Sequence, residues 1–201
     1  MTKWFMIICI GCLLYACGES KKTDYLETGW GAFSDGDYLQ ALSDLQTAKI
    51  KNPHDPEIRT ALGWTYLRLD SVESADREFA DGAQLGSAPV DLAAGWTFVL
   101  AAIHGYNASN VQAAQVLTAD PNWVFAYAEG IDYLDIRIVK AENHYLLGEF
   151  ASSLIEIKIV NPDFDADVST VTGRIQLASE IEKLRALNKS PVGPIRNYEL
   201  Q

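Results

Sequence analysis

The stretch that decides the fold is LGWTYLRLDSVESADREFADGA, at residues 62–83. It contains the pair Gly63-Trp64 and then small and aromatic residues at helical spacing: Tyr66, Ala75, Phe79 and Gly82. Small residues opposite aromatic ones allow two antiparallel helices to pack closely. The Gly-Trp pair recurs earlier in the chain at Gly29-Trp30 and later at Gly95-Trp96, and both separations are in the low thirties. A period in this range, built from helix pairs, predicts an all-α array of repeated units.

Turn residues and prolines divide the chain into these units. A glycine, an acidic residue and an aromatic residue form a turn at residues 36–38, and the same pattern returns at residues 148–150. Glycine at such a turn can take the left-handed conformation that ends a helix, and proline stops the next helix at Pro53 and Pro162. We therefore expect four repeats, at residues 24–55, 56–88, 89–121 and 133–162.

Two segments interrupt or end the array. Trp123, Phe125 and Tyr127 alternate at period two, so residues 122–132 are expected to form an extended insert. Residues 167–188 are expected to form a helix that caps the array with one polar face. Its apolar stripe is formed by Val168, Val171, Ile175, Ala178, Ile181 and Leu184. Residues 189–201, which are rich in proline, are expected to be a flexible tail.

The first repeat resembles the tetratricopeptide-repeat (TPR) consensus. The residues that carry the resemblance are Gly29, Phe33, Gly36, Asp37, Tyr38, Ala41, Ala48 and Pro53. The resemblance extends over about residues 24–162 and implies an α-solenoid of antiparallel helix pairs with a C-terminal capping helix. It also implies a concave groove that binds another protein or a peptide, and no catalytic activity.

The resemblance further implies which residues face that groove. They are Trp30, Phe33, Trp64, Leu67, Arg68, Trp96 and Val99. Stacked indoles along such a groove suit an extended or helical segment of a partner. The alternative is that the insert or the last helix covers the aromatic row from within the chain, because aromatic rows usually belong to a core.

The N-terminus has the pattern of an export signal. Lys3 is followed by a short apolar run that ends at Ala16 and Cys17, and this run is too short to span a bilayer comfortably. The residues LYAC at 14–17 resemble the lipobox of bacterial lipoproteins, in which the cysteine becomes lipidated. We therefore expect a signal peptide at residues 1–16, a lipidated Cys17, a short tether to residue 23, and anchoring at the outer membrane facing the periplasm.

Composition restricts the partners. The formal net charge is −11, and an acidic surface repels the phosphates of nucleic acids. We found no catalytic motif, no set of metal ligands and no cofactor-binding motif, so no enzyme, metal or cofactor is expected.

Two functions therefore remain open. The first is a membrane-anchored scaffold that binds an envelope protein or a basic or amphipathic peptide. The second is a lipoprotein that binds a small ligand or glycan by stacking it on the tryptophans. The sequence leaves the oligomeric state open.

Overall fold

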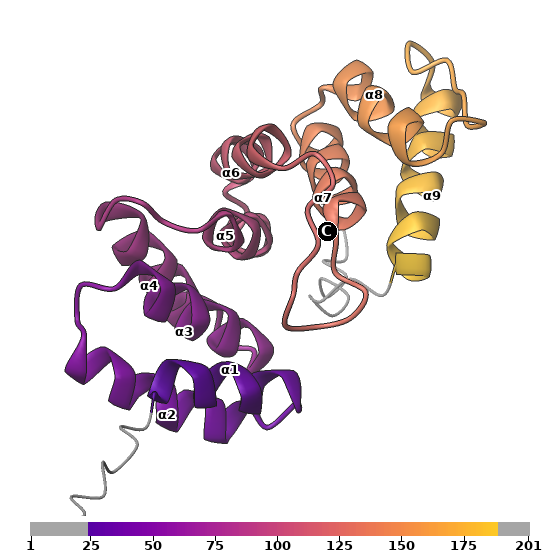
Figure 1. Cartoon of the computed structure of the whole chain (residues 1–201). Coiled ribbons are helices and arrows are strands. Elements are labelled where there is room, and N and C mark those ends of the chain that lie inside the picture. Colours follow the sequence, from indigo (N-terminus) through magenta and orange to yellow (C-terminus); the bar gives the residue numbers. More distant parts are fainter. Residues whose placement is uncertain (1–23, 189–201) are drawn as a thin grey trace, which may run out of the picture.

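The computed structural model describes residues 24–188, and this part of the chain is α-helical. It contains nine helices and no strand. They are α1 (Tyr25–Ser34), α2 (Tyr38–Lys51), α3 (Pro56–Arg68), α4 (Val72–Gln84), α5 (Val90–Ala102), α6 (Tyr106–Ala119), α7 (Tyr133–Leu146), α8 (Phe150–Val160) and α9 (Val171–Asn188). Consecutive helices pair and the pairs stack in a curved row from α1/α2 to α8, with α9 at the end (Figure 1). This arrangement confirms the expected all-α, TPR-like solenoid.

The turns between paired helices set the period of the repeat. Each turn holds one residue in the left-handed conformation: Gly36, Asp70, His104 and Gly148, with φ values of 80°, 56°, 63° and 77°. The first three are evenly spaced along the chain, and the last follows after a longer interval. The extra length corresponds to the insert between α6 and α7.

Side-chain caps explain where several helices begin. Asp24, Asp37 and Asp55 each accept hydrogen bonds from backbone N–H groups in the first turn of the helix that follows. At α7, Asp132 and Asp135 form a reciprocal capping box. The Asp135 carboxylate accepts the backbone N–H of Asp132, and the Asp132 carboxylate accepts backbone N–H groups in the first turn of the helix, including that of Leu134.

Glycines bring the two helices of a pair together, but the third Gly-Trp pair is not equivalent to the first two. A Cβ atom at Gly29 would overlap Leu45, and one at Gly63 would overlap Phe79, each on the second helix of its own pair. A Cβ at Gly95 would instead overlap Phe79 and Trp64, which belong to the preceding pair. Gly95 comes two positions too early for the period that the turns define, and two positions turn a helix by about 200°.

The insert is a folded loop rather than a strand. It forms one isolated antiparallel bridge, between Val124 and Asp132, and its chain reverses through turns near Gly130. The predicted alternation holds locally, because Trp123 and Phe125 are buried whereas Val124 is exposed. The loop therefore points alternate side chains inward without becoming a strand.

The predicted stripe of the cap helix is right in its C-terminal half and wrong at Val171 and Ile175. Helix α9 begins at Val171, because Thr170 Oγ1 accepts the backbone N–H of Gly173 and so caps the helix there. Val171 and Ile175 are 72% and 62% exposed, whereas Ile181 and Leu184 are buried as predicted. The buried face of the helix consists of Gly173, Leu177, Glu180, Ile181 and Leu184.

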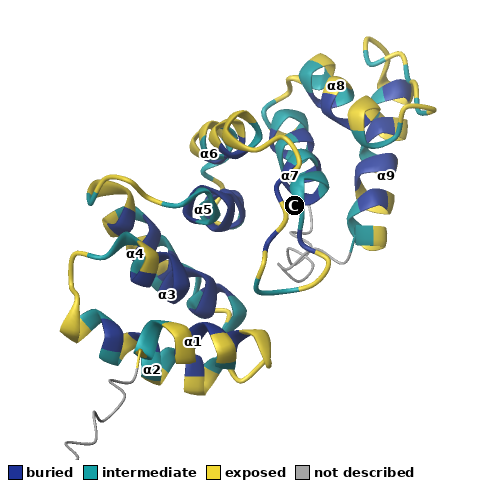
Figure 2. Cartoon of the chain, viewed as in Figure 1, coloured by how far each residue is buried: buried dark blue, intermediate teal, exposed yellow. Residues whose placement is uncertain are grey.

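The core follows the row of helices. Helices α3 and α5 lie in the middle and are buried on most sides, whereas the outer helices expose polar faces (Figure 2). No helix within residues 24–188 is long and apolar enough to cross a membrane. The signal peptide, Cys17, the tether and the C-terminal tail lie outside the described residues, so those predictions are not tested.

Candidate functional site

Of the two alternatives for the tryptophan row, open or covered from within the chain, the structure shows the covered one at Trp30 and Trp64. Five of the seven predicted groove residues are buried: Trp30, Phe33, Trp64, Leu67 and Val99. Trp96 and Arg68 are half-buried. The insert lies against this row, which agrees with the alternative that the chain covers its own aromatic residues.

Stacked rings hold the insert in the groove. The Phe125 ring stacks on Trp64, with centroids 4.1 Å apart and planes 20° apart. The Tyr127 ring stacks on Trp30 at 3.8 Å and 5°. Phe125 also meets Phe33 edge to face, with centroids 5.9 Å apart. Aromatic side chains contribute large apolar area in such contacts, so the loop is part of the core.

Trp96 does not belong to the row. Its Nε1 donates a hydrogen bond to Asp76 Oδ1 on α4, at 2.8 Å. The place that follows Trp30 and Trp64 at the period of the turns is occupied by Phe98, whose ring meets Trp64 edge to face at 6.0 Å. The sequence suggested Trp96 because the Gly-Trp pair is conspicuous, whereas the period defined by the turns points to Phe98.

Asp91, at the start of α5, joins the insert to the repeats. Its backbone carbonyl accepts Trp64 Nε1–H at 2.8 Å, and its Oδ1 accepts Trp123 Nε1–H at 2.7 Å. Burial raises the pKa of Asp91, and the hydrogen bond from Trp123 partly opposes this effect. Asp91 thus accepts two indole N–H groups, one from Trp64 on α3 and one from Trp123 in the insert.

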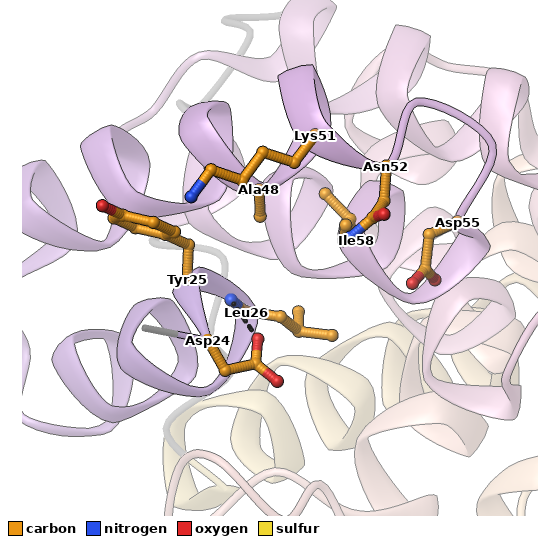
Figure 3. Close-up of a pocket in the computed structure, with 8 residues that line it drawn as sticks. All are labelled: Asp24, Tyr25, Leu26, Ala48, Lys51, Asn52, Asp55 and Ile58. Carbon is orange, nitrogen blue, oxygen red and sulfur yellow. Dashed lines mark hydrogen bonds between the residues drawn. The ribbon is translucent and has the colours of Figure 1, made fainter. Parts of the chain in front are cut away.

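A cavity of about 560 Å³ lies between α1, α2 and α3, and three of its polar side chains, Asp24, Lys51 and Asp55, are already engaged (Figure 3). Asp24 and Asp55 cap α1 and α3. Lys51 Nζ lies 3.9 Å from the centre of the Tyr25 ring. Side chains whose polar groups are used by the fold leave little for a ligand, and we do not assign a site here.

The second cavity at this end of the molecule, here called the α1–α3 pocket, is different. It measures about 350 Å³ and is lined by Asp24, Leu26, Glu27, Trp30, Gly31, Ser34, Glu57 and Tyr127. Three of these residues are acidic and none is basic. No hydrogen bond or ion pair within residues 24–188 involves the side chain of Glu27 or Glu57. Trp30 is only 5% exposed, and its Nε1 is buried without a hydrogen-bond partner.

The α1–α3 pocket is negatively charged, because its lining contains three carboxylates and no basic residue. Burial raises the pKa of Glu57, and the carboxylates of Asp55, Asp24 and Asp91 raise it further. The pKa of Tyr127 is raised by burial and by Glu57 and Asp91. Neither Glu57 nor Tyr127 is among the groove residues predicted from the sequence. The signal that could have found Glu57 is its position, one repeat period before Asp91.

Most other buried charges serve the fold. Glu78 pairs with Lys49 at 2.6 Å and with Arg59 at 2.7 Å, between helices α2, α3 and α4. Glu156 makes the corresponding pairs with Arg137 and Lys140 between α7 and α8. Among residues 24–188, no three His, Cys, Asp or Glu side chains converge as they would around a metal ion.

Comparisons with known proteins identify the architecture. No protein-family model matches the sequence, and no curated protein matches it. Solved structures do match. MamA of MSR-1 superimposes with a TM-score of 0.60 at 15% identity, over 82% of this chain and 95% of that one. YrrB, described as a TPR protein with an unusual peptide-binding site, gives 0.61 at 13% identity, over 85% and 80%.

A further similar structure is a tetratricopeptide repeat protein from Parabacteroides merdae ATCC 43184. It gives a TM-score of 0.51 at 17% identity and covers 87% of this chain and 65% of that one. At these identities the likeness concerns the fold alone. The chain therefore has the fold of a tetratricopeptide-repeat α-solenoid.

Proposed function

We propose that this protein is a non-catalytic scaffold that is anchored to the outer membrane through a lipid on Cys17. It faces the periplasm and binds another envelope protein, or a peptide segment of one, through its concave face. The observation that carries this proposal is the α1–α3 pocket at one end of the aromatic row, a cavity lined by Tyr127 of the insert and by the acidic residues Glu27 of α1 and Glu57 of α3. Most of the rest of the predicted row is closed by the insert.

Two further features support a protein partner. The insert is itself a peptide segment that lies against the aromatic row, so this surface is able to accept a segment of polypeptide. The similar structures also include YrrB, which is described as having a peptide-binding site. Anchoring is supported by the short apolar run and by Cys17 directly after Ala16.

The alternative of a small ligand or glycan stacked on the tryptophans has less support. Trp64 and Trp30 already stack on Phe125 and Tyr127. Trp96 donates to Asp76, away from the row. A stacking platform needs indole faces that are open to the ligand, and these three residues do not provide a row of them.

The partner is tested by photocrosslinking in cells. A photoreactive residue is placed at Ser34, which lines the α1–α3 pocket, and in a control at Ser43, which is exposed on α2. We expect one envelope protein to be crosslinked from Ser34 and not from Ser43. Adducts that are the same from both positions, or that arise only from Ser43, would contradict binding through the concave face.

The anchor is tested separately by Cys17→Ala. We expect the wild-type protein to incorporate labelled fatty acid and to sediment with membranes, because several acyl chains on one residue give stable anchoring. The variant should lose the label and be released from the membrane fraction. Sedimentation and labelling that do not change in the variant would contradict lipidation at this residue.

A further inference from the structure

The third repeat lacks a set of charged side chains that the second repeat has. In the second repeat, Glu78 pairs with Lys49 and Arg59. Arg59 also pairs with Asp81, at 3.3 Å. One repeat later, at the period that the turns define, all four of these positions hold uncharged residues. Those residues are Ala83, Ala93, Gln112 and Gln115.

The shorter and uncharged side chains leave a cavity, here called the α4–α6 hollow. It measures about 330 Å³ and lies between the end of α4, the start of α5 and α6. Its lining consists of Ala83, Ala88, Pro89, Val90, Leu92, Ala93, Gln112, Gln115 and Ala119, none of which is charged. In the fourth repeat Arg137 and Glu156 again form an ion pair at the corresponding positions. The third repeat thus has an uncharged hollow where the repeats on either side have paired charges.

The outer face of α6 extends this uncharged surface. Among the nine helices within residues 24–188, α6 alone contains no Asp, Glu, Lys or Arg. Its exposed residues recur at helical spacing along one side, which we call the α6 face. They are Asn107, Ala108, Val111, Ala114, Gln115, Thr118 and Ala119. A stretch of helix about 21 Å long is therefore exposed without one charge, in a chain whose formal net charge is −11.

The hollow lies away from the insert. Asp91 accepts the indole N–H of Trp123 in the insert, whereas Ala93 lines the hollow. Residues two positions apart in an α-helix are about 200° apart around its axis, so the insert and the hollow lie on opposite sides of α5. Contacts made through the hollow and the α6 face therefore leave the aromatic row undisturbed.

Charge selects the occupant of this surface. A basic partner is attracted more strongly by the carboxylates elsewhere on the molecule than by a face without any. A second copy of this chain carries the same net charge of −11, and like charges brought together across an interface cost free energy. Two copies therefore meet with the least repulsion where carboxylates are absent. Of the helices within residues 24–188, α6 meets this condition best.

The two glutamines suit such a pair. In a twofold-symmetric dimer, residues near the axis meet their own copies. A carboxylate there faces a second carboxylate, whereas a carboxamide both donates and accepts hydrogen bonds and so can pair with its own copy. Gln112 and Gln115 have this property, and Glu78 and Asp81, which hold the same positions one repeat earlier, do not.

We propose that the α6 face forms a twofold interface between two copies of this chain, with Gln112 and Gln115 near the axis. The exposed alanines of α6 allow the two helices to approach closely, because interaxial distance depends on the side chains at the contact. One pair of helices buries less than the about 800 Å² per partner of a standard interface, so the dimer is weak.

The interface is tested by photocrosslinking in cells that express two copies of the full chain with different epitope tags. A photoreactive residue is placed at Val111, which is 57% exposed on the α6 face. The control position is Ser43, which is exposed on α2 and lies at the same place two repeats earlier. We expect an adduct that carries both tags from Val111 and none from Ser43. Adducts with another protein only, equal two-tag adducts from both positions, or no adduct would overturn the inference.

Matched variants test the uncharged character of the interface, with the photoreactive residue at Val111 throughout. Gln115→Glu should reduce the two-tag adduct by about tenfold or more, because two carboxylates then face each other. Gln46→Glu introduces the same charge at an exposed position on α2 and should leave the adduct unchanged. Circular dichroism shows that each variant keeps its helices. Equal loss in both variants, or no loss in Gln115→Glu, would contradict the proposed interface.

A double variant tests the hollow itself. Ala93→Arg combined with Gln112→Glu rebuilds the ion pair that Arg59 and Glu78 form, so it should fill the hollow and retain the fold. We expect the two-tag adduct to fall by about tenfold or more in this variant as well. An adduct that persists would overturn the inference. The result does not depend on the crosslink from Ser34, so the dimer and the proposed partner are tested separately.

Discussion

Replacing Phe125 by alanine should cost this protein a large part of its stability, although the residue lies in a loop. The ring is 2% exposed, stacks on Trp64 at 4.1 Å and touches Trp30 and Phe33 edge to face. Removing a buried phenylalanine usually costs about 3–5 kcal/mol, and each aromatic pair adds about 0.5–1.5 kcal/mol. These contacts place the expected loss at about 4 kcal/mol of unfolding free energy.

The assay is urea unfolding followed by circular dichroism. With a slope of about 2 kcal/mol per molar urea, this loss shifts the midpoint by about 2 M. Fluorescence quenching by acrylamide should increase in parallel, because Trp64 loses its cover. Val124→Ala is the control in the same loop: Val124 is 64% exposed, and the change should be within about 0.5 kcal/mol. A loss below about 1 kcal/mol, or one no larger than the control's, would refute the conclusion that the insert is core.

Four other substitutions test the fold. The pKa of Asp135 is raised to about 7, chiefly by burial, so the folded state binds the proton more tightly than the unfolded state. The wild type should therefore lose about 2–3 kcal/mol of stability between about pH 5 and pH 8, and Asp135→Asn should flatten this dependence in urea titrations; an unchanged slope would contradict it. Gly63→Ala, which meets the Phe79 ring, should lower stability by about 1–3 kcal/mol. Gly31→Ala, which enters open space within a helix, should raise it by about 0.5–1 kcal/mol, and equal effects would refute this assignment. Glu78→Gln should lower the melting temperature and cost about 3 kcal/mol, since Lys49 and Arg59 lose the negative charge that pairs with them; a cost near zero would show that these ion pairs are not needed.

Local signals were sufficient for the repeated helix pairs. Gly36 and Gly148 mark turns because only a residue that tolerates positive φ fits there, and Pro53 ends a helix for steric reasons. Asp70 and His104 adopt the same turn conformation without being glycine, so the period of the repeats is clearer in the structure than in the amino-acid sequence. The lipobox at Cys17 is also a local signal, but it lies outside the described residues and stays a prediction.

The prediction that Trp96 of the third Gly-Trp pair joins the aromatic row was wrong for a physical reason. Gly95-Trp96 looks like its two predecessors in the sequence. Successive residues of an α-helix are rotated by about 100° around its axis, so a displacement of two positions places Trp96 on a different face of α5. Its hydrogen bond to Asp76 is the result. The stripe predicted for α9 was wrong at Ile175 for a related reason, because Ile175 and Leu177 are both apolar and only tertiary packing selects Leu177 for burial.

The sequence by itself determined that this chain forms a row of helix pairs, because propensity, turn conformation and helix spacing depend on neighbouring residues. Only the tertiary structure decided that Trp30 and Trp64 are covered. An indole has the same chemistry in a core as in a binding site, and what covers these two comes from Phe125 and Tyr127, far along the chain. The α1–α3 pocket depends on the tertiary structure in the same way, because Tyr127 of the insert lines it together with residues of α1 and α3.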